Sequence, residues 1–205
     1  ANLSEWYFEK FATDESSTEG LFEDYDHPNT RVTHMTVDHE LPMTFWRSVG
    51  HSYTAFAKES MIDEMAEAAG MDEVAFRLQN TQNTPRLNNV IRVAGEHMAK
   101  MNPREGHHLG FAAHHSFYTD VAEIAEVSVE NGKIRVHKVT CVLDCGQAVN
   151  PDIVRSQMEG AVIYGLTAAL YGGLNLENGA IKESNFHDYP MLRMNESPEI
   201  EVIII

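Results

Sequence analysis

The residue pattern best suited to chemistry is a short polar loop, residues 45–52, that precedes a predicted helix. It places the cation Arg47 beside the small polar Ser48 and beside Gly50, directly before the expected helix N-terminus. Free backbone N–H groups at a helix start, together with a guanidinium, are the groups that an anion or a phosphate binds. The loop therefore indicates an anion site, although a plain helix cap accounts for the same residue types.

A second junction of this kind covers residues 144–151, Asp-Cys-Gly-Gln-Ala-Val-Asn-Pro, and leads into another predicted helix. On that helix Gln157 stands close to Gly160 among apolar neighbours. A primary amide both donates and accepts hydrogen bonds, so Gln157 can pair with the edge of a heterocycle. The structural alternative is a core glutamine whose hydrogen bonds are satisfied within the protein.

The eleven histidines include two doublets, His107-His108 and His114-His115, which raise the question of a zinc site. Their segment is predicted to be extended, and adjacent residues on a strand point to opposite faces of the sheet. No cysteine or acid lies at a matching helical spacing and no H-E-x-x-H motif occurs, whereas zinc needs ligands that converge on one point. Surface or pocket histidines are therefore favoured, and we predict no metal ligand among them.

Two other chemistries receive little support from the sequence. Cys141 and Cys145 would share one face of an extended run at a separation of about 13 Å, too far for a disulfide, which favours buried thiols. Ser48 has no assignable base, and the sequence contains no G-x-S-x-G, G-x-G-x-x-G or P-loop motif. The residue types thus indicate neither a serine hydrolase nor a common nucleotide-binding loop.

The elements that position these residues follow from the spacing of apolar side chains. Residues 1–46 lack sustained periodicity and are expected to be irregular, apart from a short strand at residues 31–37. Helices are predicted at residues 53–69, 73–79 and 87–101. Ser52 and Asp72 are the expected N-caps of the first two helices. In the first helix, apolar residues keep the spacing of one face at Phe56, Met61, Ile62, Met65 and Ala69.

From residue 106 onward the pattern changes to strands. Strands are predicted at residues 110–115, 121–129, 133–143 and 199–205. Asn131-Gly132 is a strong signal for a two-residue hairpin between two of them, and Asn178-Gly179 marks a further turn. This order of helices and strands predicts an α+β fold, with helices packed on a mixed or antiparallel sheet.

A long helix is predicted between these strands, at residues 152–170. It contains Gly160 and Gly165, and each glycine costs about 1 kcal/mol relative to alanine in an exposed helix. Two glycines within one helix indicate the close approach of another backbone or of a ligand.

The formal net charge of −16, from 15 basic and 31 acidic residues, argues against a nucleic-acid ligand, because phosphates need a basic surface. No apolar run approaches the roughly 18 residues of a membrane span, and the N-terminus lacks a signal-peptide pattern. The chain stops at residues 203–205, three isoleucines within a predicted strand. Because an unpaired apolar strand invites aggregation, we expect the 205 residues to be a piece of a longer chain.

The two junctions and several further motifs together resemble the molybdenum-binding subunit of the xanthine oxidase family of molybdenum hydroxylases. The likeness is to the branch that holds the isoquinoline 1-oxidoreductase beta chain and related aldehyde dehydrogenases, and it extends from Gly20 onward. The matching segments are FWRSVGHS (45–52), ESMIDE (59–64), VAEIAEV (121–127), DCG (144–146), VNP (149–151), QMEG (157–160) and SNFHDYPMLRM (184–194). Their shared order makes the resemblance specific to this branch.

The resemblance implies an enzyme that hydroxylates N-heterocycles or oxidises aldehydes, with oxygen taken from water. It implies a molybdenum–pterin cofactor, in this branch the molybdopterin cytosine dinucleotide, and a separate small iron–sulfur subunit that receives the electrons. Arg47 would lie beside the molybdenum centre, and Gln157 would hydrogen-bond the cofactor. Val49, Ala113 and His114 would line the substrate pocket.

This sequence also departs from the family pattern. The family's general base is a glutamate in a Gly-Val-Gly-Glu segment that would follow residues 199–205, so no catalytic residue is assigned. The cofactor-wrapping Met-Gly-Gln-Gly and Gly-Gly-Gly-Phe-Gly segments do not occur either. We therefore expect residues 1–46 to continue a missing upstream region and residues 47–205 to form a partial cofactor-binding domain.

Such a partial domain is expected to be inactive alone and to bind no cofactor tightly. The alternative is a non-catalytic assembly module that retains the same fold and packs against partner subunits. Enzymes of this branch are periplasmic or cytoplasmic, and the sequence itself assigns no compartment.

Overall fold

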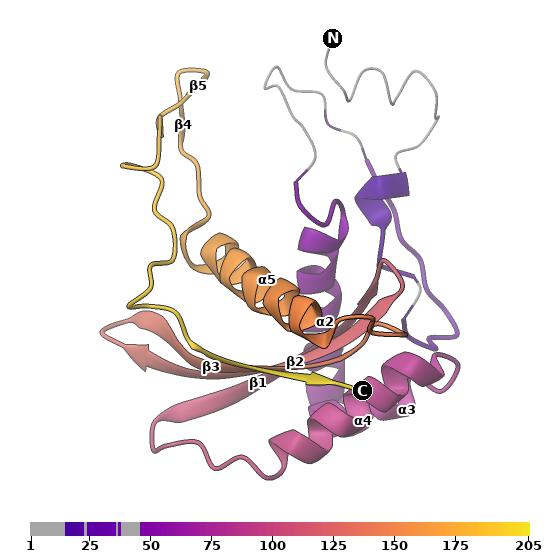
Figure 1. Ribbon diagram of the computed structural model, residues 1–205. Coiled ribbons are helices and arrows are strands. Elements are labelled where there is room, and N and C mark those ends of the chain that lie inside the picture. Colours follow the sequence, from indigo (N-terminus) through magenta and orange to yellow (C-terminus); the bar gives the residue numbers. More distant parts are fainter. Residues whose placement is uncertain (1–14, 23, 36, 38–45) are drawn as a thin grey trace.

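The computed structural model describes residues 15–22, 24–35, 37 and 46–205, and within them it confirms the predicted α+β fold (Figure 1). The helices are η1 (Glu15–Thr18), a short 3-10 turn, and α2 (His51–Ala68), α3 (Glu73–Gln79), α4 (Pro85–Met98) and α5 (Pro151–Tyr171). The strands are β1 (His107–Ser116), β2 (Thr119–Glu130), β3 (Lys133–Asp144), β4 (Leu176–Glu177), β5 (Ala180–Ile181) and β6 (Glu199–Ile204). The division of the chain after residue 46 stays a prediction.

In the described part of the chain, β1, β2, β3 and β6 form one mixed sheet in that order. The first three strands make an antiparallel meander, whereas β6 lies parallel to β3, with Ile204 opposite Leu143. A parallel pair needs a crossover connection, and α5 lies within the one between β3 and β6. The terminal isoleucines are thus paired rather than bare, since Ile205 N also donates to Leu143 O at 3.0 Å.

The sheet carries α4 on one face and α5 on the other (Figure 1). The core against α4 consists of Leu87, Val90, Ile91 and Ala94 with Phe111, Ala113, Ala122, Ile124 and Val142. The core against α5 consists of Val136, Val139, Cys141 and Val162, with Met158, Leu166 and Leu170 at its margin. Because side chains alternate along a strand, Cys141 and Val142 serve different cores.

Two local predictions are confirmed in detail. Asn131 and Gly132 join β2 to β3 with φ values of 53° and 76°, the left-handed pair that a two-residue type I′ turn needs. Asp72 caps α3, because its carboxylate accepts hydrogen bonds from the N–H groups of Val74 and Ala75.

The start of α2 differs from the prediction. Its N-cap is Gly50 rather than Ser52, and no side chain caps the helix. Ser52 instead donates its hydroxyl to the carbonyl of Val49 at 2.9 Å. A Cβ atom at Gly50 would lie 2.0 Å from the carbonyl oxygen of Ser16, so this close approach requires glycine.

The buried face of α2 also differs from the apolar face in the sequence. Of the apolar residues, Phe56 is 77% exposed, Met61 55% and Met65 37%. The buried positions are Thr54, Lys58, Glu59, Ile62 and Ala66. The apolar spacing correctly included Ile62 but missed Lys58 and Glu59, because these two buried side chains form ion pairs, which a count of apolar residues does not detect.

One predicted strand and the ends of one predicted helix also need correction. The short strand predicted at residues 31–37 does not form at residues 31–35 and 37, which are the part of it that the structure describes. The helix predicted at residues 87–101 begins two residues earlier, at Pro85, and ends at Met98. Proline fits the first helical turn because its missing N–H has no partner there in any case.

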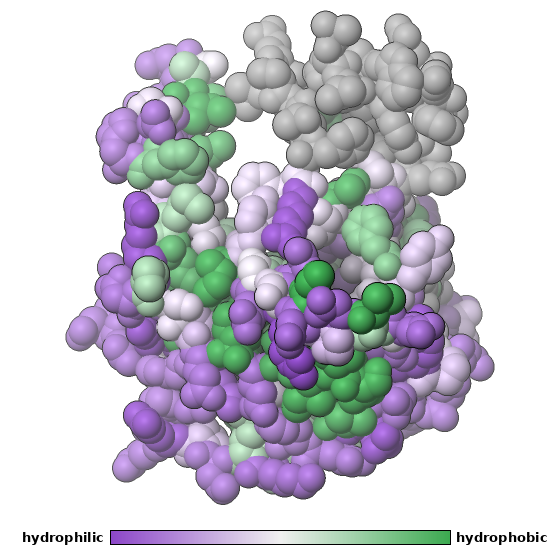
Figure 2. Space-filling view, in the orientation of Figure 1, coloured by the Kyte–Doolittle hydropathy of each residue, from purple (hydrophilic) through white to green (hydrophobic). Residues whose placement is uncertain are grey.

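The segment after α5 projects away from the sheet as the β4–β5 hairpin and the loop that returns to β6 (Figure 1). It exposes the large apolar side chains of Leu174, Leu176, Ile181, Phe186 and Met194. Figure 2 shows another apolar patch over the end of β6. None of the helices in the described ranges has the length and hydropathy needed to cross a bilayer.

Candidate functional site

The turn at residues 46–50, directly before α2, has a strained backbone. Ser48 and Val49 have φ values of 75° and 50°, a region that costs a non-glycine residue about 1–2 kcal/mol. The N–H of Val49 donates to the carbonyl of Trp46 at 3.0 Å and closes the turn. Such strain persists where surrounding structure fixes it, and it is concentrated at functional sites. The turn is the loop in which the sequence predicted an anion site.

This turn lies against α5. The ring of Tyr164 is 5.6 Å from the ring of Trp46, and its centroid is 5.3 Å from the guanidinium carbon of Arg47. Gln157 precedes Tyr164 by about two helical turns, so both side chains project from the same face of α5. The structure therefore brings Arg47 and Gln157, both exposed, to one side of this helix.

The helix α5 is open at both of its glycines, and Gly160 lies close to the face that carries Gln157 and Tyr164. A Cβ atom built on Gly160 or Gly165 would meet no described atom within 4 Å. The approach of another backbone, which these glycines predicted, thus does not occur among the described residues. The helix itself starts at a fixed point, because the side chain of Asn150 accepts hydrogen bonds from two N–H groups of its first turn.

A network of hydrogen bonds joins His114 to α2. Its Nε2 lies 2.8 Å from Nδ1 of His51, the first residue of that helix. Its Nδ1 lies 3.0 Å from Nζ of Lys58 and 3.4 Å from Oδ2 of Asp24. Lys58 also pairs with Asp24 and donates to the carbonyl of Gly20 at 2.7 Å. The network therefore runs from buried Asp24 to the residue that follows the strained turn.

The other two residues of the predicted pocket lie apart from each other. Val49 is half-buried in the turn before α2. Ala113 is 2% exposed, and its side chain packs in the core against α4. Its N–H donates to Oε2 of Glu59 at 2.8 Å, whereas His114, the next residue, belongs to the opposite face of β1. A role in substrate binding stays a prediction for all three residues.

The family model described as "Molybdopterin cofactor-binding domain" matches residues 44–198, which include both junctions. The chain belongs to this molybdopterin cofactor-binding domain family. The match and the relatives described next confirm the resemblance to the molybdenum-binding subunits of the xanthine oxidase family.

Two curated relatives of this molybdopterin cofactor-binding domain are longer proteins. The beta chain of isoquinoline 1-oxidoreductase from Brevundimonas diminuta is 34% identical over 213 residues, which cover 100% of this chain and 27% of the relative. A nicotinate dehydrogenase subunit of Pseudomonas putida is 30% identical over 201 residues, 88% of this chain and 17% of the relative. The chain thus spans about a quarter or less of their length.

A solved structure shows the same fold. The aldehyde oxidoreductase from Desulfovibrio desulfuricans ATCC 27774 superposes with a TM-score of 0.56 over 78% of this chain and 35% of that one. At 13% sequence identity, the similarity concerns the fold alone.

Sequence reasoning missed a buried ion pair that anchors α2 of the molybdopterin cofactor-binding domain. Nε of Arg77, whose side chain is fully buried, donates to Oε2 of Glu59 at 3.0 Å. The hydroxyl of Tyr25 donates to Oε1 of the same carboxylate at 2.8 Å. Burial, and then the charge of Glu59, raise the pKa of Tyr25, which therefore stays a neutral donor. The helical spacing of Glu59, Ile62 and Ala66 was the signal available in the sequence.

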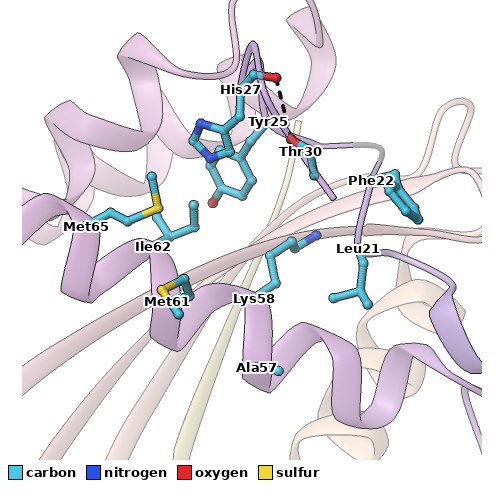
Figure 3. A pocket seen from close by; sticks show the side chains of 10 residues that line it. All are labelled: Leu21, Phe22, Tyr25, His27, Thr30, Ala57, Lys58, Met61, Ile62 and Met65. Atoms are coloured by element: carbon cyan, nitrogen blue, oxygen red, sulfur yellow. Dashed lines mark hydrogen bonds between the residues drawn. The ribbon is translucent and has the colours of Figure 1, made fainter. Parts of the chain in front are cut away.

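A cavity of about 220 Å³ opens between α2 and the segment that contributes Leu21, Phe22, Tyr25, His27 and Thr30 (Figure 3). Met61, Ile62 and Met65 of α2 form much of its apolar wall. On the other side, the rings of Tyr25 and His27 stack at 5.7 Å, and Nε2 of His27 is buried with no hydrogen-bond partner among the described residues. Lys58 also lines the cavity, which therefore adjoins the network of His114.

Two histidines of the sequence doublets form pairs with acidic side chains, and the two cysteines form no disulfide. His107 pairs with Glu126 at 2.5 Å and His115 pairs with Asp120 at 2.9 Å. Within the described ranges, no three histidine, cysteine or acidic side chains converge on a point that could hold a metal ion. Both cysteines are free, and burial raises the pKa of the Cys141 thiol.

Proposed function

We propose that the chain acts within a molybdenum-dependent oxidoreductase that hydroxylates N-heterocycles or oxidises aldehydes. The observation that carries this proposal is the packing of Arg47 against the face of α5 that also presents Gln157. Family membership supports the cofactor class, and the names of the relatives, an isoquinoline oxidoreductase chain and a nicotinate dehydrogenase chain, support the substrate class.

The described residues fit a pterin cofactor on this face. The open position over Gly160, three residues after Gln157 on the helix, leaves room for a flat ring beside the amide of Gln157, which can donate to and accept from the ring edge. The guanidinium of Arg47 suits an anionic oxygen or a phosphate. When bound, the molybdenum–pterin group supplies the two-electron oxidation of the substrate. The resemblance further favours the cytosine dinucleotide form of the pterin.

On the substrate side, His114 and Val49 are the residues that we assign to the pocket. His51 and Lys58 fix the ring of His114 through both nitrogens, so His114 can hold or pass on a proton without turning. Ala113 acts through its backbone, because its N–H bond to Glu59 fixes the strand from which His114 projects.

Electrons would leave through a separate small iron–sulfur subunit, as the resemblance implies. We also propose that these 205 residues alone are inactive and retain no cofactor tightly, because they match only 27% and 17% of the length of two curated relatives. The test is to measure the molybdenum content and the turnover of the purified chain. Stoichiometric molybdenum or catalytic turnover would overturn the proposal that the chain is inactive alone.

The cofactor assignment is tested in the holoenzyme that contains the chain. Arg47→Ala and Gln157→Ala should each lower the bound molybdenum and the released pterin by roughly tenfold, the usual effect of losing an orienting contact. Arg155→Ala is the matched control, since Arg155 is exposed on α5 and pairs only locally with Asp152 in the described structure. Equal cofactor content in all three variants would contradict the proposal.

The second candidate is a non-catalytic assembly module, and the exposed apolar arm at residues 172–198 favours it. A module of this kind would bind a partner subunit through Leu174, Leu176 and Phe186 and would need neither Arg47 nor Gln157. Serine substitutions at the three apolar positions should then abolish subunit association, while the Arg47 and Gln157 variants leave molybdenum content unchanged. Intact subunit association in the serine variants, together with a loss of molybdenum in the Arg47 and Gln157 variants, favours the enzyme.

A further inference from the structure

We propose that Arg86 is a positioning residue that fixes the two cofactor-facing junctions relative to each other. This inference rests on the proposed function, since the junctions are those that present Arg47 and Gln157. Arg86 lies in the first turn of α4, on the α4 side of the sheet, and acts through residues of two loops rather than on a ligand.

The guanidinium of Arg86 binds the end of β3 and the β1–β2 turn together. Its Nε donates to Oδ2 of Asp144 at 3.0 Å and its Nη2 donates to Oδ1 at 2.9 Å, the paired geometry of a strong arginine–carboxylate contact. Nη2 also donates to the carbonyls of Asp144, at 3.1 Å, and of Tyr118, at 3.3 Å. One side chain thereby ties two separate turns to the start of α4.

On one side, Asp144 begins the loop that leads to α5. Its Oδ1 also accepts the N–H of Gly146 at 2.8 Å, and Gly146 has a φ of 70°, so the carboxylate shapes the turn directly. The loop continues to Asn150, which caps α5, and the helix then presents Gln157. The orientation of Gln157 therefore depends on the turn that Arg86 holds.

On the other side, Phe117 and Tyr118 form the turn between β1 and β2. Their φ values of 46° and 63° suit asparagine and glycine far better than aromatic residues, so this turn needs support from outside. The bond from Arg86 to Tyr118 O gives such support. The ring of Phe117 then lies 5.4 Å from the ring of His51, next to the strained turn at residues 46–50.

Charge makes Arg86 hard to replace at this place. Asp120 and Asp144 stand directly opposite each other on β2 and β3, and like charges in such a pair destabilise the sheet. Nε of Arg86 is 3.6 Å from Oδ2 of Asp120, whose Oδ1 is paired with His115. A neutral residue at position 86 leaves the two carboxylates opposed, and a lysine restores the charge without the paired hydrogen bonds.

The first test is hydrogen exchange on the 205-residue chain without cofactor. In Arg86→Gln, the amides of residues 117–121 and 144–150 should exchange about tenfold faster, because their anchoring hydrogen bonds are lost. Arg86→Lys should give a smaller increase. Arg92→Gln is the matched control, since Arg92 on the same helix pairs with Glu96 at the surface, and it should change neither segment.

Unchanged exchange of both segments in Arg86→Gln, or an equal change in Arg92→Gln, would overturn the inference. Arg86→Lys keeps the positive charge. If Arg86→Gln does not fold, the exchange of the same two segments is therefore compared between Arg86→Lys and wild type.

The second test measures molybdenum content in the holoenzyme. Arg86→Gln should lower it severalfold, with partial rescue in Arg86→Lys, whereas equal content in wild type and Arg86→Gln would overturn the positioning role. A wild-type holoenzyme without molybdenum, combined with faster exchange in both segments of Arg86→Gln, would contradict the proposed function but support the positioning of the two junctions. The two failures are therefore distinguishable.

Discussion

The guanidinium of Arg47 and the ring of Tyr164 are in cation–π contact, with 5.3 Å between the guanidinium carbon and the ring centroid. The contact joins the strained turn before α2 to the middle of α5, two segments that are distant in the sequence. Because Gln157 lies on the same face of α5, a single aromatic side chain supports the relative position of both candidate cofactor residues.

The first prediction concerns Tyr164. Replacing it with alanine should free the turn at residues 46–50, because the contacts of its ring with Trp46 and Arg47 are lost. In a Trp6→Phe background, where Trp46 is the remaining tryptophan, the fluorescence emission should shift to the red and acrylamide quenching should increase. Cation–π contacts at exposed sites contribute about 0.5–1 kcal/mol, so global stability should change little.

Tyr164→Phe is the control for this experiment, because it keeps the ring and should retain the wild-type spectrum. Identical spectra for the alanine variant and wild type would mean that Tyr164 does not hold the turn.

The second prediction concerns the buried Glu59–Arg77 pair. Arg77→Met leaves the Glu59 carboxylate buried without its cationic partner and should lower the free energy of unfolding by about 3–5 kcal/mol. Urea unfolding followed by circular dichroism measures this loss. The surface variant Arg92→Met should cost only about 0.3–0.5 kcal/mol, the usual contribution of an exposed pair one helical turn apart.

Combining Arg77→Met with Glu59→Gln should cost less than the sum of the two single substitutions, because the unpaired charge is then removed. Strict additivity would show that the two side chains do not act as a pair.

The third prediction concerns pH and Glu123, a half-buried residue on β2 whose carboxylate faces the Cys141 thiol at 3.5 Å. Burial raises the pKa of Glu123 above its usual value of 4.5. Below that value the carboxyl is protonated in both folded and unfolded chains. As the pH rises, Glu123 ionises first in the unfolded chain. Its contribution to the free energy of unfolding is therefore lost as the pH rises through the pKa that Glu123 has in the folded protein.

Glu123→Gln imitates the protonated carboxyl and should remove this loss. The unfolding free energy of the variant relative to wild type should therefore increase as the pH rises above the usual glutamate pKa of 4.5, which urea titrations at a series of pH values can measure. Glu105→Gln, the same substitution at an exposed position before β1, is the control for the removal of a carboxylate outside the core. A Glu123→Gln advantage that shrinks as the pH rises would contradict the burial argument.

The fourth prediction separates the two thiols. Cys141 has no exposed surface and a raised pKa, whereas Cys145 is half-buried in the loop after β3. Iodoacetamide should therefore modify Cys145 in the folded protein and reach Cys141 only in denaturant, as peptide mass spectrometry can show. In Cys145→Ser, native labelling should disappear. Labelling of Cys141 under native conditions would indicate that α5 detaches from the sheet.

Local signals explain where the sequence predicted the fold correctly. The Asn131-Gly132 turn and the Asp72 cap depend on a few neighbouring residues whose backbone preferences are strong, and both form as expected. The collinear motifs also predicted the family correctly, and the structure places the first junction against the helix that follows the second one, through the contact of Arg47 with Tyr164.

The errors arose where distant contacts override local preference. The buried face of α2 carries Lys58 and Glu59 beside Ile62, and the partners Asp24 and Arg77 lie elsewhere in the chain, so apolar spacing alone identified only part of this face. The cap at Gly50 depends on the carbonyl of Ser16, far away in the sequence. The hydrogen bonds of Arg86 to Asp144 and Tyr118 could not be predicted from the sequence either, because such a prediction requires knowledge of which turns meet at the start of α4.

The parallel pairing of β6 with β3 has a consequence for the order of folding. The three-stranded meander joins neighbours in the sequence, but Thr140 meets Glu201, at a sequence separation of 61, only after the chain between them closes a loop that includes α5. Because long loops slow contact formation, α5 and β6 should dock after the meander has formed. The helix face that carries Gln157 would then be completed late, and an early intermediate would still lack the surface proposed to hold the cofactor.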